Sequence, residues 1–177
     1  MLDYAITLEF DKDTENKIRA MMDEVAAATG CTFMLDAGVP PHVTVSMVVS
    51  DDEERLISDI GDIAGGMQKH TISFANIGVF NPYVIYLGPV MNEFLLDTCR
   101  TVNDRLLKYN EPGNLSRYLP YQWVPHAAVA VGLQPGTINE AFSIILNKFT
   151  AFDATAEKII LARAEPYEEL RSWELNG

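Results

Sequence analysis

Short stretches of the chain alternate between apolar and polar residues, which is the pattern of strands with one buried face. The clearest alternation runs from Tyr4 to Phe10. Similar alternation, or a short apolar run bounded by turn residues, marks several later stretches. The pattern predicts strands at 4–10, 42–49, 70–80, 84–90, 126–133, 156–164 and 169–175, with a further short strand at 33–39.

Other stretches carry apolar residues at intervals of three or four positions, the spacing of one helix face. A predicted helix at 14–29 ends at Gly30, where a C-cap glycine is expected. The segments 50–53 and 137–140 read as capping boxes that open two more helices. The first of these ends before Gly65, the second carries the apolar residues of 141–146, and a further helix is predicted at 93–109.

The dipeptide Pro-His occurs twice, and each copy opens a short apolar strand. The two histidines, His42 and His126, each lie near the middle of one half of the chain. Side chains alternate between the two faces of a strand. We therefore expect the residues two and four positions after each histidine on the same face as that histidine: Thr44 and Ser46 in the first copy, Ala128 and Ala130 in the second.

The two halves of the chain repeat one order of elements. Each reads as strand, helix, Pro-His strand, helix and strand, and no glycine-rich phosphate loop of a doubly wound fold is present. This order favours an α+β class. We predict one domain over 1–177, with two pseudo-symmetric lobes from an internal duplication, repeat units of about 1–82 and 83–177, and antiparallel-rich sheets around a central cleft.

The charge balance narrows the class of partner. The chain has 13 Lys+Arg against 25 Asp+Glu, a formal net charge of −12, and no basic run. Binding to a long nucleic-acid backbone depends on basic surface that releases counterions. The charge therefore disfavours a long duplex as a partner, whereas a nucleotide, a short RNA end or another small phosphate ester is compatible with a local positive site.

The remaining composition describes an ordinary compact protein. Hydrophobic residues make up 48% of the 177 positions, enough for a real core. The longest apolar runs are too short to span a bilayer, and the N-terminus lacks the features of a signal peptide. Two cysteines, Cys31 and Cys99, fit a reducing compartment and have no zinc-site spacing. We expect a cytoplasmic monomer with no membrane partner, no metal and no cofactor.

Two histidines that face one cleft are suited to acid–base chemistry at a phosphodiester. Cleaving a phosphodiester with water needs one group to activate the water and another to protonate the leaving oxygen. Histidine suits both tasks because its unperturbed pKa is near neutrality. A lone histidine on a strand is usually structural, so the interpretation depends on the matched pair, His42 and His126.

The motifs resemble those of the 2H phosphoesterase superfamily, in particular its bacterial RNA 2′,3′-cyclic phosphodiesterases, also called 2′-5′ RNA ligase-like proteins. The first His-x-Thr/Ser motif is complete in His42-Val43-Thr44, while the second, His126-Ala127-Ala128, keeps the histidine and lacks the hydroxyl. The stretch from 159–161 through Tyr167 to 173–175 is similar to the family's closing strands. The resemblance implies a two-lobed fold, metal-independent hydrolysis of a cyclic phosphate, and a role in RNA processing.

The resemblance also implies the site residues. His42 and His126 would be the acid–base pair, and Thr44 a donor to the phosphate oxygens. Because Ala128 lacks a hydroxyl, another donor could replace it, and the loop that enters the second Pro-His strand offers four candidates: Arg117, Tyr118, Tyr121 and Trp123. Arg117 is the strongest of these candidates, since a guanidinium binds phosphate through two parallel, bidentate hydrogen bonds. The predicted substrate-binding residues are Thr44, Arg117 and Tyr121.

Two other functions are compatible with the sequence. The chain could be a non-catalytic binder of a small phosphate or nucleotide with a degenerate second motif, which the small residues Ala128 and Ala130 favour. It could also be an acidic interaction domain with no site. That last interpretation predicts that His42 and His126 do not converge in space.

Overall fold

The computed structural model describes residues 2–81, 83–109, 111–112 and 117–177. Its strands and helices are interspersed along the chain, as the sequence pattern predicts. In chain order they are β1 (Leu2–Phe10), α1 (Lys12–Thr29), α2 (Phe33–Asp36), β2 (His42–Ser50), α3 (Glu53–Ala64), β3 (His70–Phe80), β4 (Val84–Pro89), α4 (Glu93–Leu106), β5 (Glu111–Pro112), β6 (Ala127–Val131), α5 (Ile138–Lys148), β7 (Phe152–Arg163) and β8 (Glu168–Glu174).

The predicted strand at 33–39 is wrong, because residues 33–36 form the short helix α2. The hydroxyl of Thr32 donates to the carboxylate of Asp36 at 2.6 Å, across this single turn. Within the helix, Met34 is buried against the core while Phe33 is 59% exposed. This single helical turn thus covers the core through the side chain of Met34.

The two predicted capping boxes are also wrong in detail. Helix α3 is capped by Asp52, whose carboxylate accepts from the Arg55 backbone N–H at 3.1 Å. Ser50 instead accepts from the Asp52 backbone N–H. At α5 the Thr137 side chain makes no capping hydrogen bond and donates to the carbonyl of Gln134. Helix α5 nevertheless begins directly after Thr137, as predicted, whereas α3 begins at Glu53, two residues later than a cap at Ser50 would place it.

Among the described residues, eight strands form one sheet in the order β5-β2-β1-β7-β3-β4-β6, with β8 paired to β7. The pairings between these strands are antiparallel. Strand β7 organises the sheet, since it pairs with β1, with β3 and with β8. Residues 159–162 of β7 are fully buried at the centre of the molecule. The predicted α+β class with an antiparallel sheet is confirmed.

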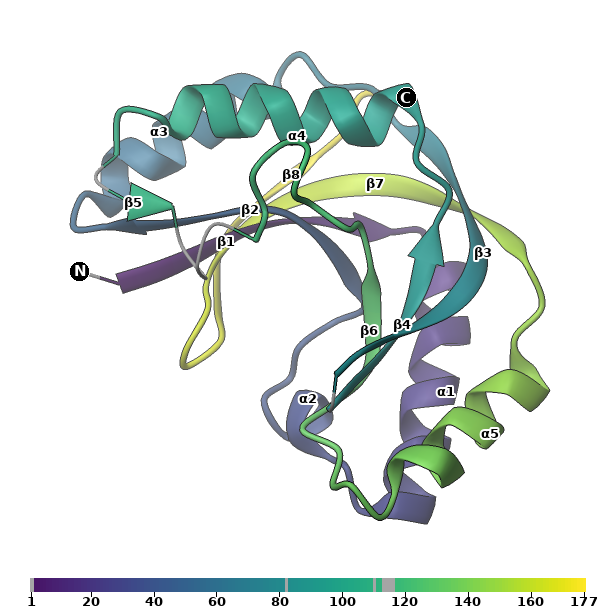
Figure 1. Cartoon of the computed structure of the whole chain (residues 1–177). Coiled ribbons are helices and arrows are strands. Elements are labelled where there is room, and N and C mark those ends of the chain that lie inside the picture. The colour runs from purple at the N-terminus through teal and green to yellow at the C-terminus, as the bar shows by residue number, and fades with distance from the viewer. Residues whose placement is uncertain (1, 82, 110, 113–116) are drawn as a thin grey trace.

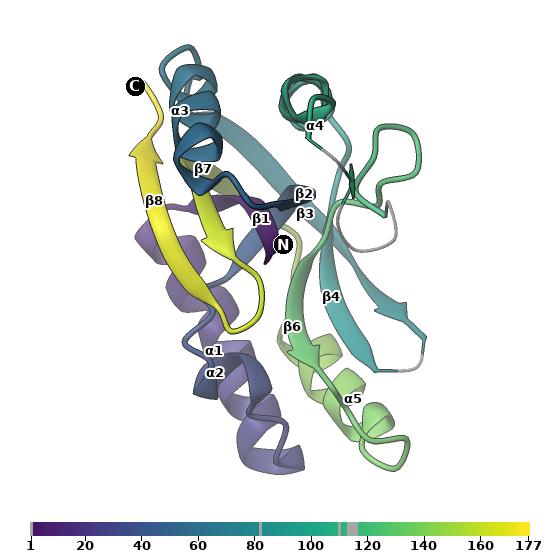
Figure 2. The same cartoon turned by 90° about the vertical axis from the view of Figure 1, so that its left-hand side faces the viewer.

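The helices and the curvature of the sheet determine which strands meet. Helix α1 lies beside α5, and α3 lies beside α4 (Figure 1). Each of these pairs takes one helix from 1–82 and one from 83–177, so the helical layers do not follow the two halves of the chain. The division into repeat units stays a prediction. Strands β2 and β6 lie far apart in the strand order, yet the curled sheet brings them together (Figure 2).

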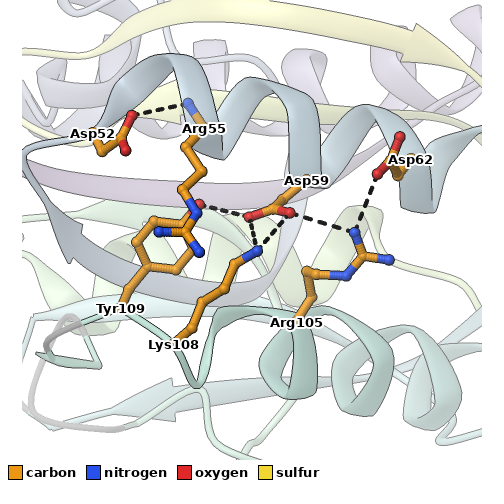
Figure 3. Close-up of polar contacts among 7 residues, drawn as sticks. All are labelled: Asp52, Arg55, Asp59, Asp62, Arg105, Lys108 and Tyr109. Carbon is orange, nitrogen blue, oxygen red and sulfur yellow. Dashed lines mark hydrogen bonds and ion pairs between the residues drawn. The ribbon is translucent and has the colours of Figure 1, made fainter.

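A buried carboxylate joins α3 to the end of α4 (Figure 3). Asp59 on α3 accepts from Lys108 Nζ at 2.8 Å and from the Tyr109 hydroxyl at 2.6 Å, and Arg105 Nη1 lies 3.4 Å from it. Burial raises the pKa of Asp59, but the hydrogen bonds from Lys108 and Tyr109 outweigh it and hold the pKa below its ordinary value. The cluster holds α4 in place, and α4 in turn packs against β2.

Candidate active site

One cavity of about 790 Å³ brings both Pro-His strands together. His42 and Thr44 line it from β2, while His126 and Ala128 line it from the second Pro-His segment. The convergence contradicts the interpretation of the chain as a domain without a site, which required the two histidines to lie apart. Much of the remaining lining is apolar or aromatic and comes from α2, the segment after it, the β3–β4 turn and β6: Phe33, Met34, Val39, Val79, Phe80, Tyr83, Val84 and Val131.

Arg117 lines the same cavity as the histidines, together with its neighbours Tyr118 and Gln122. Among the described residues that line the cavity, Arg117 carries the one permanent charge. Tyr121, the third predicted substrate-binding residue, is not part of the lining. Its side chain is 83% exposed, its φ is +68°, and its hydroxyl accepts from Arg100 Nη2 at 2.5 Å. The structure thus gathers four of the five predicted residues and places Tyr121 outside them.

The two histidines are anchored in the same way. His42 Nδ1 lies 2.8 Å from the carbonyl oxygen of Pro40, and His126 Nδ1 lies 2.8 Å from that of Val124. In both cases the partner is the residue before the proline of the Pro-His pair. A carbonyl oxygen can only accept, so Nδ1 carries a hydrogen in each ring. The other nitrogen, Nε2, is thereby left to exchange a proton with a bound molecule.

A β-bulge follows each histidine at the same distance. In β2, Thr44 pairs with Thr7 and Ser46 with Ile6, so Val45 is an extra residue. In β6 the same shift makes Val129 the extra residue, because Ala128 pairs with Tyr86 and Ala130 pairs with Ile85. Each bulge therefore begins three positions after a histidine. The residue two positions after the histidine keeps its face, and the residue four positions after it does not.

The bulge corrects one expectation from simple alternation. Alternation places Ser46 on the face of His42 and Thr44, but Ser46 pairs with the buried Ile6 and is itself fully buried. Its hydroxyl donates to Asn103 Oδ1 on α4 at 3.0 Å. The residue at 130 is buried in the same way, paired with 85. The positions that line the cavity after the two histidines are therefore 44 and 128.

The surroundings of both rings favour their neutral form. Burial lowers the pKa of His42, opposed by the Pro40 hydrogen bond, and the nearby His126 lowers it further. Burial also lowers the pKa of His126, and the Val124 hydrogen bond opposes that effect. Because a charge on His126 disfavours a second charge on His42, the two rings resist being protonated together. As pH falls, the pair therefore passes through a state with one neutral and one protonated imidazole, which is the state that acid–base catalysis needs.

Aromatic rings surround His126. The Phe80 ring meets it edge-on with centroids 4.8 Å apart, Tyr86 lies at 5.5 Å, and Tyr118 stacks on it at 6.2 Å. Phe80 and Tyr86 also stack on each other at 4.4 Å. Sequence reasoning assigned no role to Phe80, and the one available signal was the aromatic cluster on either side of the β3–β4 turn. Tyr83 in that turn also lines the cavity and is 45% exposed.

Two further observations concern the described residues. They contain no group of three or more His, Cys, Asp or Glu arranged to hold a metal ion. They also include no helix that is both long and apolar enough to cross a membrane. The lining residues best suited to hold a phosphate group are the two histidines, Thr44 and Arg117.

Comparison with known proteins agrees with the fold. The model of the 2′-5′ RNA ligase superfamily matches residues 12–171. The chain is similar to the structure of TT0787 of Thermus thermophilus (TM-score 0.65, 15% identity, 99% of each chain covered). It is also similar to E. coli LigT complexed with 3′-AMP (TM-score 0.60, 14% identity, 99% of each chain) and with ATP (TM-score 0.58, 15% identity, 99% of this chain and 98% of that one).

A sequence search of curated proteins found no match. The structural likenesses, at this level of identity, show a shared fold, while the family model spans nearly the whole chain. The chain belongs to the 2′-5′ RNA ligase superfamily.

Proposed function

We propose that this protein hydrolyses a cyclic phosphodiester, on a 2′,3′-cyclic nucleotide or a short RNA end, by acid–base catalysis between His42 and His126. Membership of the superfamily is consistent with phosphodiesterase or ligase activity. The observation that carries the finer proposal is the matched pair of histidines on one cavity, each anchored through Nδ1 to a carbonyl. Because Nδ1 of each ring is held by a carbonyl, Nε2 of each ring is the atom that would transfer the proton.

The proton transfers need only water and the two imidazoles. The neutral histidine takes a proton at Nε2 from water as the water oxygen bonds to phosphorus. The protonated histidine gives its proton to the ribose oxygen as the bond between that oxygen and phosphorus breaks. Hydrolysis of a cyclic phosphate thus leaves a phosphomonoester and a free hydroxyl. In the reverse direction, which would be ring closure or ligation, the two histidines exchange roles.

Thr44 and Arg117 support the charge on the phosphate. The charge on the non-bridging oxygens has to be met by donors that are already in place. Thr44 lines the cavity two residues after His42, where its hydroxyl would donate to one oxygen. Arg117 would donate to the others through its guanidinium. The described lining carries one permanent positive charge, which matches the single negative charge of the one phosphodiester group that reacts.

The ligand class receives support from the relatives. E. coli LigT has been crystallised with 3′-AMP and with ATP. A cavity of about 790 Å³ with a largely apolar lining is also far larger than a phosphate ion requires. A nucleotide or the terminal residue of a short RNA would occupy more of this space. The cytoplasmic location, the monomeric state and the role in RNA processing stay predictions.

A non-catalytic phosphate or nucleotide binder is the second candidate, and Ala128 favours it. At the position where the first motif presents the Thr44 hydroxyl, the second presents a methyl group. The loss of one donor to a charged group slows a reaction by about 10- to 100-fold, whereas loss of a catalytic histidine costs roughly 10²–10⁴-fold. Since both histidines are present, the enzyme is the better-supported candidate.

The test is turnover of the four nucleoside 2′,3′-cyclic phosphates and of a short RNA with a cyclic end, in the presence of EDTA. We expect product with the unmodified protein and a loss of roughly 10²–10⁴-fold in His42→Ala and in His126→Ala. His70→Ala is the matched control, because His70 lies outside the cavity lining and stacks on Phe94. Saturable binding without turnover would instead establish the binder, and equal activity in all three variants would contradict a histidine mechanism.

A further inference from the structure

A buried amide on α4 contacts the surroundings of both histidines. Asn103 is 7% exposed and lies in the last turn of α4, although asparagine is a weaker helix former than most residues. Its Oδ1 accepts from Ser46 Oγ at 3.0 Å. Its Nδ2 donates to the carbonyls of Cys99 at 2.8 Å and Tyr118 at 3.1 Å, with the carbonyl of Val45 more distant at 3.5 Å. The amide is thus held by partners on three separate segments.

Apart from Cys99, which lies on α4 itself, these partners belong to the two segments that carry the histidines. Ser46 lies on β2, four residues after His42. Tyr118 lies in the loop before β6, and its ring stacks on His126 with centroids 6.2 Å apart. Asn103 therefore bonds both to the strand that carries one histidine and to the loop that supports the other.

Trp123 makes a second, direct connection. Its indole is 7% exposed, and Nε1 donates to the carbonyl of Thr44 at 3.0 Å. Trp123 precedes His126 by three residues, and Thr44 follows His42 by two. One hydrogen bond thus joins the backbone beside the first histidine to the segment that delivers the second.

Strand β2 has little strand pairing on the side away from β1. Among the described residues, β5 pairs there only with Val48 and Val49, and no strand pairing joins β2 to β6. The backbone beside the bulge at Val45 is therefore available to side-chain donors. The carbonyls of Thr44 and Val45 accept from Trp123 and Asn103 respectively. Side-chain bonds at the bulge thereby take the place of a ladder between the two histidine strands.

We propose that Asn103 and Trp123 are positioning residues that set the separation of His42 and His126 across the cavity. The inference rests on the proposed two-histidine function for its kinetic consequence, but the positioning itself is a property of the fold. The catalytic geometry is sensitive at this scale, because a misplacement of about 1 Å can cost a hundredfold in rate. Neither residue lines the cavity, so both act through the imidazoles.

The kinetic test uses Trp123→Phe, which removes the indole N–H and keeps an aromatic ring. We expect kcat to fall roughly 10- to 100-fold while KM changes less than about threefold, because the groups that line the cavity are retained. Trp173→Phe is the matched control, since Trp173 lies on β8 and outside the cavity lining, and it should leave both constants unchanged. An unchanged kcat in folded Trp123→Phe would overturn the proposal.

An NMR titration tests the positioning independently of turnover. The pKa of His42 is measured with His126 present and in His126→Gln, and the difference reports the influence of one ring on the other. That difference should shrink in Trp123→Phe, because the rings are no longer held at their separation. If Trp123→Phe fails to fold, Ser46→Ala removes one hydroxyl from the Asn103 bridge and should change the difference in the same direction.

The two measurements separate the two possible failures. If the unmodified protein turns over no cyclic phosphate while the histidine coupling still depends on Trp123, the proposed function fails and the positioning stands. If the coupling is the same in every folded variant, the positioning proposal is overturned whatever the activity.

Discussion

Restoring a hydroxyl to the second motif is expected to raise activity. Ala128 lines the cavity two residues after His126, as Thr44 does two residues after His42. Ala128→Thr adds a β-branched side chain, which suits a strand, at a position that is only partly buried. Because positions two apart on a strand share a face, the new hydroxyl would point to the same space as the His126 ring.

The size of the gain follows from the bond that is added. A hydrogen bond to a charged group contributes about 1.5–3 kcal/mol. If that bond forms to a phosphate oxygen in the transition state, the rate rises by about 10- to 100-fold. The reverse change, Thr44→Val, should lower the rate by a similar factor, because it removes the donor that the first motif already has.

The assay is kcat/KM on the cyclic nucleotide that the unmodified protein turns over best, for Ala128→Thr and Ala128→Val. Valine has nearly the shape of threonine without its hydroxyl, so the ratio of the two variants isolates the hydrogen bond. A ratio of about ten or more supports the assignment. Equal rates in the two variants would refute the reasoning that the second motif lacks a phosphate donor.

Three further changes test the energetics of the fold. Burial raises the pKa of Glu9 to about 7, and its Oε1 has no hydrogen-bond partner among the described residues. The contribution of Glu9 to stability therefore falls as pH rises from 4.5 through 7. In urea titrations, Glu9→Gln should raise the free energy of unfolding by about 1–3 kcal/mol at pH 8 and change it little at about pH 4. Asp59→Asn should lower the free energy of unfolding at pH 7 by about 1–3 kcal/mol, because the hydrogen bond from Lys108 becomes weaker. The pKa of Asp59 is lower in the folded protein than in the unfolded chain, so its ionised form stabilises the fold above pH 3.8 and loses this effect in acid. The deficit of the variant should therefore shrink as pH falls below 3.8. Gly78→Ala places a Cβ against the ring of Tyr86, closer than a side chain tolerates, so the ring must shift and thermal unfolding should show a loss of about 1–3 kcal/mol.

The features that depend on local pattern were predictable from the sequence. The alternation around His42 and His126 predicted two strands, and the repeated Pro-His pair predicted that both would meet one cavity. The structure confirms the strands and brings the histidines together. In both copies the carbonyl of the residue before the proline lies 2.8 Å from the histidine Nδ1, so the repeated dipeptide places its two imidazoles in the same way.

The features that the sequence missed depend on contacts between distant segments. A bulge moves Ser46 off the face of His42, and alternation cannot reveal an extra residue in a ladder. The apolar segment 33–36 becomes a helix because Met34 reaches a core built from other elements. The placement of Tyr121 depends on Arg100, which lies on a different element. The pairing of α1 with α5 and of α3 with α4, which joins helices from the two halves of the chain, likewise depends on contacts between distant segments.

The pH dependence of kcat/KM for a cyclic nucleotide, measured with EDTA present, tests the central claim most directly. The rate should rise with pH as the base loses its proton and fall as the acid loses its own, giving a bell. Because His42 and His126 both have a pKa below the ordinary value of 6.5, the maximum should lie below pH 6.5. A rate that climbs steadily to alkaline pH, or one that EDTA abolishes, would contradict catalysis by this pair.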